Sequence, residues 1–163
     1  MRDETLFLNG VYKSMLKEIL LVQEEMPEQI MFLQPYKSSS IVHLRDDPPT
    51  LDEPMQLYIS TRENLPTIKY EAEIVGWDNK REMPRAKRRV ISRLIWTLQP
   101  EEGGLYDKSA TAKGSVNLLH IRRLRELTKA FSVERLTKKS DGKRVSPKRT
   151  TSGGWTYVEV RNG

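Results

Sequence analysis

The sequence predicts an α+β fold in which a small, curved, mainly antiparallel β-barrel is packed by flanking helices. Four segments alternate apolar and polar residues as half-buried strands do: 55–61, 67–77, 115–121 and 155–160. Two segments, near 11–25 and 84–99, instead repeat apolar residues at the three- and four-residue spacing of amphipathic helices. A chain of 163 residues without cysteine can bury a core without disulfides, so we expect one domain over 1–163.

The N-terminal part is expected to supply one helix and two short strands. Val11, Met15 and Ile19 lie on one face of a helix predicted over 11–23, and Pro27 ends it. The apolar run 30–33 and the β-branched run 40–45 have the length of strands. Three prolines and four acids make 46–54 a loop.

The middle of the chain predicts a strand pair followed by the second helix. Segments 55–61 and 67–77 are joined by a turn at 62–66, and the longer strand places Ile68, Tyr70 and Ala72 on one face. Pro84 suits the first turn of a helix and Pro100 stops it. The glycine pair that follows makes 101–114 a predicted loop.

The C-terminal part predicts two strands separated by turns. After the strand at 115–121, Ser132 is expected to cap a single helical turn over 133–136. Asp141-Gly142 is typical of a hairpin turn, and 155–160 forms the last strand.

Charge is divided unevenly between the two parts of the chain. Residues 1–57 carry five basic and ten acidic side chains, a net of −5, whereas residues 58–163 carry 23 basic and 12 acidic ones, a net of +11. Such segregation favours a polyanionic partner. The alternative is a charged surface that only keeps the protein in solution.

Two basic clusters are the candidate phosphate contacts. Segment 79–93 surrounds the single acid Glu82 with seven basic residues: Lys80, Arg81, Arg85, Lys87, Arg88, Arg89 and Arg93. A second cluster, near the predicted hairpin, opposes only Asp141 to six basic residues, of which Lys143 and Arg144 are the predicted contacts; the others are Lys138, Lys139, Lys148 and Arg149. Clustered arginine and lysine with few acids is typical of nucleic-acid binding.

Three aromatic residues are candidates for stacking on a base. Trp77 and Trp155 each stand beside a glycine at the edge of a predicted strand, and Tyr36 follows a proline before a serine run. Stacking on such rings tolerates any base. Trp96, beside the apolar stripe of the basic helix, is expected in the core.

No catalytic, metal or cofactor pattern stands out. His43 and His120 lie in strand-like runs without neighbours at metal-ligand spacing, and the chain has no P-loop, nucleophile elbow or dinucleotide fingerprint. We therefore expect no metal, no cofactor and no catalytic residue. No apolar run approaches the roughly 20 residues that span a bilayer, so we expect a cytoplasmic protein without a membrane partner.

One segment resembles the PUA-like superfamily, particularly its ASCH and EVE branches. It covers residues 58–77 and has the sequence Y-I-S-T-R-E-N-L-P-T-I-K-Y-E-A-E-I-V-G-W. Segment 35–40, which leads into a strand ending at Arg45, and Gly153-Gly154-Trp155 fit the same pattern, so the resemblance covers about residues 30–160. ASCH proteins carry the pattern G-x-K-x-x-E-x-R, and here only His43-Leu44-Arg45 lies near the expected place. EVE domains line a modified-base pocket with aromatic residues, for which Trp77 and Trp155 are the candidates. The resemblance implies a PUA-like barrel that binds RNA or an extruded modified base.

Together these features predict a non-enzymatic nucleic-acid-binding module, and two alternatives stay open. One is an ASCH-like enzyme acting on RNA or nucleotides, for which Lys37, Ser38, His43 and Arg45 are the candidate residues. The other is a protein-interaction domain whose basic faces dock an acidic partner.

Overall fold

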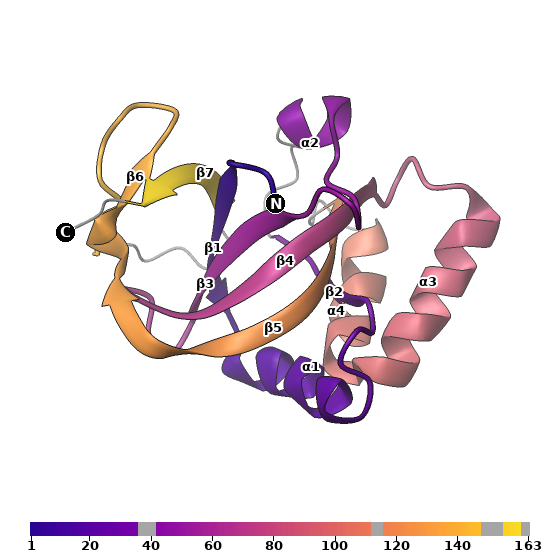
Figure 1. Cartoon of the computed structure of the whole chain (residues 1–163). Coiled ribbons are helices and arrows are strands. Elements are labelled where there is room, and N and C mark those ends of the chain that lie inside the picture. The colour runs from indigo at the N-terminus through magenta and orange to yellow at the C-terminus, as the bar shows by residue number, and fades with distance from the viewer. Residues whose placement is uncertain (36–41, 112–115, 148–154, 161–163) are drawn as a thin grey trace.

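A mixed β-sheet forms the centre of the computed structural model, which describes residues 1–35, 42–111, 116–147 and 155–160 (Figure 1). Within these residues the sheet has seven strands in the order β2-β5-β4-β3-β1-β7-β6. The strands are β1 (Thr5–Val11), β2 (Met31–Leu33), β3 (Met55–Thr61), β4 (Thr67–Asn79), β5 (Asn117–Ser132), β6 (Leu136–Lys138) and β7 (Trp155–Val160). Neighbours are antiparallel except for β1 and β3, which are parallel. The predicted α+β class and mainly antiparallel sheet are confirmed.

The sheet is strongly curved but not closed. β4 and β5 are its longest strands, and their register shifts three times, between Ile68 and Tyr70, between Glu71 and Glu73, and between Ile74 and Gly76. Such irregularities bend a strand pair, and Figure 1 shows β5 sweeping under β4. At the second shift Arg123 adopts a left-handed φ of 53°. The described pairings leave β2 and β6 at opposite ends of the sheet, so they do not form the predicted barrel.

Alternate residues of each strand fill different cores, as the two-residue period of a strand requires. In β1, Leu6 and Leu8 belong to the main core between the sheet and α1, while Phe7 points into a smaller core on the opposite face. In β7, Trp155 belongs to the main core and Val158 to the smaller core. β1 is therefore buried on both faces, whereas β4 alternates buried and partly exposed residues.

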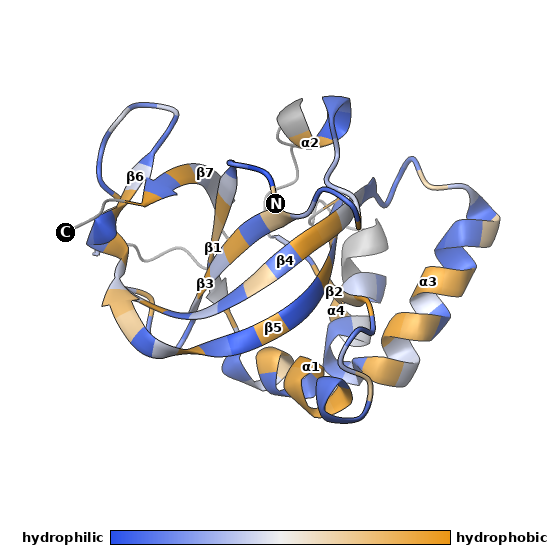
Figure 2. Cartoon of the chain, viewed as in Figure 1, coloured by the Kyte–Doolittle hydropathy of each residue, from blue (hydrophilic) through white to orange (hydrophobic). Residues whose placement is uncertain are grey.

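Four helices and one 3₁₀ turn complete the described structure. They are α1 (Lys13–Glu25), α2 (Val42–Asp46), α3 (Arg85–Leu98), α4 (Pro100–Thr111) and η1 (Val133–Arg135). α3 and α4 pack against each other at the end of the sheet that carries β2 (Figure 1). Hydrophobic and hydrophilic residues are interleaved along α3 (Figure 2), and its buried residues Ile91 and Ile95 join Phe32, Tyr106 and Leu118 in a third core.

Two sequence predictions near the N-terminus are corrected. The predicted helix starts at Lys13, and residue 11 instead ends strand β1, which the sequence analysis did not predict. The core residues of β1 form a continuous apolar run. Such a run suits a strand that is buried on both faces, but it lacks the alternation by which half-buried strands are identified. The strand predicted over 40–45 is also wrong where it is described, because residues 42–46 form α2.

The loop predicted over 101–114 is wrong as well, since α4 occupies 100–111. Pro100 ends α3 but also opens α4, because proline fits a first helical turn whose N–H groups have no partner inside the helix. Gly103 is required by packing: a Cβ there would lie 2.8 Å from Cδ2 of Trp96. The glycine pair thus marks a close helix contact.

The structure agrees more closely with three predictions for the C-terminal part of the chain. The strand predicted at 115–121 is confirmed over 117–121, the start of β5, which continues to residue 132; residue 115 lies outside the described residues. Ser132 caps η1, and its Oγ accepts a hydrogen bond from the Glu134 amide at 3.1 Å. The turn at Asp141-Gly142 is confirmed, since the Lys138 amide donates to the Lys143 carbonyl at 2.8 Å and Gly142 has a φ of 70°.

Candidate functional site

The outer face of α3 carries a row of arginines. Arg85, Arg89 and Arg93 follow one another at four-residue spacing, so they form a stripe on one side of the helix, and all three are exposed. Among the described residues, none of these three side chains has an ion pair or a hydrogen bond. The opposite side of α3 is held in place by buried Ile91 and Ile95.

The arginines of β5 provide a contrast. Arg122 lies 2.9 Å from Glu73, Arg123 lies 3.1 Å from Glu28, and Arg125 pairs with Glu71. These partners come from the neighbouring strand or from the loop after α1, so the charge of β5 is largely compensated. The charge of the α3 stripe is not.

The other predicted phosphate contacts near α3 differ in accessibility. Arg81 is exposed in the turn before the helix. Lys87 pairs with Asp78 at 2.8 Å, and half-buried Arg88 donates to the Met83 carbonyl at 3.2 Å. Lys80 is only 3% exposed, so the structure places it in the interior instead of on a phosphate-binding surface.

Lys87 shares its acid with a histidine. His120 Nε2 and Lys87 Nζ each lie 2.8 Å from Asp78, on different carboxylate oxygens. Burial alone would raise the pKa of Asp78, but the hydrogen bonds from these two side chains lower it below its ordinary value. The cluster ties the end of β4 to α3 and to β5.

An open groove runs between α3 and α4 beside the arginine stripe. Its volume is about 510 Å³, and its lining consists of Arg88, Arg89, Ser92, Arg93, Tyr106 and Asp107. Trp96 stands one helical turn beyond Ser92 and Arg93. Its ring packs on Gly103, its Nε1 donates to Asp107 at 3.0 Å, and it is 45% exposed.

The prediction that Trp96 lies in the core is therefore wrong. The ring is fixed on one side by a glycine and open to solvent on the other, next to uncompensated arginines. The signal was present in the sequence, because positions 85, 89, 93 and 96 follow one side of a helix. The prediction of a core position rested only on the nearby apolar stripe.

The structure does not bring the second basic cluster to α3. Lys143 and Arg144 are exposed in the turn after β6, and Figure 1 shows β6 and α3 at opposite ends of the molecule. Lys138 in that cluster pairs with Asp141 at 3.1 Å. Lys148 and Arg149 lie outside the described residues. The two clusters are separate surfaces.

The two stacking candidates whose structure is described, Trp77 and Trp155, do not line a common pocket. Trp155 is 1% exposed and belongs to the main core. Half-buried Trp77 donates from Nε1 to Asn117 Oδ1 at 2.9 Å, and the Arg45 guanidinium lies 5.7 Å from its ring centroid. Tyr36, like Lys37 and Ser38 of the alternative enzyme site, lies outside the described residues.

Of the other two residues considered for an enzyme, only one side chain is described. Arg45 pairs with Glu82 at 2.9 Å on the surface. The backbone of His43 lies in α2, but its side chain is not among those described.

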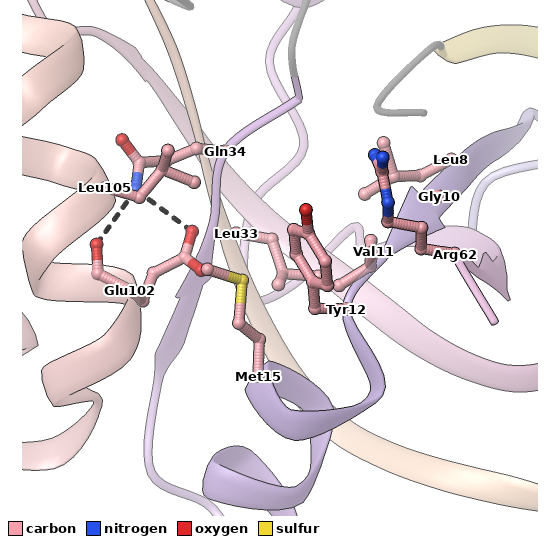
Figure 3. A pocket seen from close by; sticks show the side chains of 10 residues that line it. All are labelled: Leu8, Gly10, Val11, Tyr12, Met15, Leu33, Gln34, Arg62, Glu102 and Leu105. Atoms are coloured by element: carbon pink, nitrogen blue, oxygen red, sulfur yellow. Dashed lines mark hydrogen bonds between the residues drawn. The ribbon is translucent and has the colours of Figure 1, made fainter. Parts of the chain in front are cut away.

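A separate pocket, which we call the Glu102 pocket, lies where β1, α1, β2 and α4 meet (Figure 3). Its volume is about 270 Å³. Glu102 is 1% exposed, and Gln34 Nε2 donates to its Oε1 at 3.0 Å and to its carbonyl oxygen at 3.3 Å. Lys80 Nζ in turn donates to Gln34 Oε1 at 2.7 Å, so Gln34 joins a buried acid to a buried base.

Burial shifts both titratable groups of this network toward neutrality. It raises the pKa of Glu102 to about 7, and it lowers the pKa of Lys80 to about 8. The ammonium of Lys80 also lies 5.1 Å from the ring centroid of Tyr106. Buried groups that titrate near neutral pH often mark functional sites. Glu102 was not predicted as a site residue, because the sequence pattern predicts a loop at its position.

Neither a membrane-spanning helix nor a group of metal-binding side chains occurs in the part of the chain that the structure describes. Comparison with protein-family models, with curated proteins and with solved structures found no match, so no relative supplies a role for these residues.

Proposed function

We propose that the protein is a nucleic-acid-binding module, acting in the cytoplasm, whose α3 face holds the phosphate backbone. The observation that carries the proposal is the stripe of Arg85, Arg89 and Arg93, which is exposed and forms no ion pair among the described residues. Such cations release condensed counterions when they meet phosphates, and this release drives binding. The paired arginines of β5 are less suited to this role.

Trp96 extends the proposal from phosphates to bases. Its ring lies on the same side of α3 as the arginines, and one ring face is fixed by Gly103. Bases of a single strand can stack on such a ring while the phosphates follow the arginines. A single strand therefore fits this surface better than a duplex, whose bases are already stacked.

The PUA-like resemblance belongs to the same proposal. It also implies a nucleic-acid partner, RNA or DNA with a modified base. The closed barrel it implies differs from the open sheet that the described strands form. Half-buried Trp77 and Tyr36 are the residues through which an extruded base would be read in that version. The proposed role of the α3 face in phosphate binding does not depend on this resemblance.

The test is the salt dependence of binding to a fluorescent single-stranded RNA and a single-stranded DNA of the same sequence. Arg85, Arg89 and Arg93 are changed together to glutamine. Each lost phosphate contact lowers the log–log salt slope by about 0.7 on single strands, so we expect a decrease of about 2. Unchanged slope and affinity would contradict the proposal.

The matched control removes three exposed basic residues at the opposite end of the molecule. Changing Lys139, Lys143 and Arg144 to glutamine lowers the net charge by the same amount. We expect a smaller effect on the slope. The reverse result would place the phosphate contacts on the turn after β6.

An acidic protein partner is the second candidate for the α3 face, because the same uncompensated charge attracts carboxylates. Trp96 distinguishes the two, since a stacked base contacts its ring and a simple acidic chain does not. Competition between labelled RNA and polyglutamate at equal charge concentration separates them. Displacement of the RNA by polyglutamate at equal concentration would favour the protein partner.

A further inference from the structure

The walls of the Glu102 pocket are mainly apolar. Leu8, Met15 and Leu33 line its interior, while Tyr12 and Leu105 stand at its edge, 45% and 38% exposed. An apolar cavity of about 150 Å³ is enough to hold benzene. With a volume of about 270 Å³, this pocket is therefore large enough for a molecule that has one ring and a polar substituent.

A polar group is buried at one end of the pocket. Figure 3 shows Glu102 and Gln34 at that end and Arg62 at the other. Gln34 occupies Oε1 of Glu102, but Oε2 is buried and accepts no hydrogen bond from any described residue. A buried carboxylate oxygen without a donor is costly, so this oxygen marks where a ligand donor is missing.

The charges around Glu102 indicate which kind of donor fits. Lys80 is linked to it through Gln34, and the nearby carboxylate of Glu18 on α1 raises the pKa of Glu102. Glu18 Oε2 accepts a hydrogen bond from the Glu101 amide at 3.1 Å, whereas its Oε1 is also buried without a partner among the described residues. Two carboxylates and one ammonium leave a net charge of −1 when all are ionised. One further positive charge balances them.

The groups at the far end do not supply that charge. The Arg62 guanidinium lies over the ring of Tyr12, 5.2 Å from its centroid, and the residue is exposed. It stands at the opposite end of the pocket from Glu102 (Figure 3). The apolar body of a ligand would lie between these two ends, against Leu8, Met15 and Leu33.

We propose that the Glu102 pocket binds a small organic cation: an amine or amidine on an apolar body of about one ring. The N–H groups of the cation bond to Glu102 Oε2, and the body packs on Met15 and the surrounding leucines. This site is independent of the α3 surface.

Benzamidinium is the probe, and uncharged benzamide of nearly the same shape is its comparison. Binding is measured by NMR titration of the methionine methyl groups, since Met15 lines the pocket. Because the cation requires ionised Glu102, whose pKa is about 7, its affinity should rise about tenfold from pH 6 to pH 8. Benzamide should bind at least tenfold more weakly at pH 8, without this pH dependence.

Two variants assign the effect to one carboxyl group. Glu102→Gln should reduce benzamidinium affinity at least tenfold at pH 8 and abolish its pH dependence. Glu101→Gln changes the neighbouring exposed acid, which does not line the pocket, and should preserve both. The wild-type protein gives an independent readout: bound benzamidinium should lower the pKa of Glu102 in ¹³C carboxyl titrations. The absence of saturable binding at millimolar concentration, or equal binding by Glu102→Gln, would overturn the proposal.

Discussion

At the scale of single residues, the three tryptophans occupy three different environments. Trp155 is fully buried, Trp77 is half-buried and hydrogen-bonded to Asn117, and Trp96 is exposed beside the arginine stripe. Sequence alone did not separate them, because Trp77 and Trp155 share the same setting, after a glycine at a strand edge, and Trp96 stands beside an apolar stripe. Their accessibility is decided by what tertiary structure places over each ring.

Trp96→Ala is expected to weaken single-strand binding by about 1–3 kcal/mol and to leave the fold intact, since it removes an exposed stacking surface. Trp96→Phe should restore part of the affinity. Fluorescence anisotropy measures the binding and thermal melts check the fold. If Trp96→Ala binds RNA normally while the triple arginine variant does not, the phosphate surface stands and the stacking role fails.

Trp155→Ala serves as the contrasting substitution. Removing a ring from the core should cost about 3–5 kcal/mol of unfolding free energy, because a cavity remains. Chemical denaturation measures it. Stability close to that of the wild type, together with weaker RNA binding, would show that Trp155 contacts the ligand.

At the scale of elements, regular pattern determined which segments the sequence could identify. β3, β4 and α3 were predicted because each has one buried and one exposed face. α4 was not predicted, because Pro100 and Gly103 are read locally as breakers although a helix contact requires the glycine. The Glu102 pocket lies between elements of which two, β1 and α4, were missed, so it could not be foreseen. The α3 arginines were foreseen, since spacing on one helix needs no tertiary information.

The two neighbouring glycines of α4 offer a matched pair. Alanine at Gly104 meets nothing within 4 Å and should raise stability by about 0.5–1 kcal/mol, because alanine favours helix. Alanine at Gly103 would place a Cβ 2.8 Å from the Trp96 ring. It should therefore shift the ring, lower stability relative to Gly104→Ala and change tryptophan fluorescence. Equal melting temperatures would contradict this packing.

At the scale of the whole molecule, buried titratable groups make stability depend on pH. The pKa of Glu102 rises from 4.5 to about 7 on folding, so the folded state holds its proton more tightly than the unfolded state. The stability this gives is complete below about pH 4.5 and is lost as pH rises to 7. The pKa of Lys80 falls from 10.5 to about 8 on folding, so the contribution of Lys80 to stability increases with pH between those values.

We therefore expect this network to be least stable between about pH 7 and pH 8. The Glu102 shift corresponds to about 3 kcal/mol between its two limits. Glu102→Gln should remove the decline between pH 5 and pH 7, as measured by urea denaturation at each pH. An identical decline in Glu102→Gln would assign it to other groups.

The pairing of β1 with β7 has a consequence for how the protein is made. Leu8 lies opposite Trp155, so residues 147 positions apart must meet before β1 has both of its neighbours. Contacts this distant in sequence form slowly. A ribosome releases the chain in order, so β1 has to wait with one edge unsatisfied until the final strand emerges. During that interval the unpaired N–H and C=O groups along its edge are open to pairing with other nascent chains. A chain that ends before residue 155 should therefore aggregate more readily than the chain of 163 residues, as light scattering after refolding would measure.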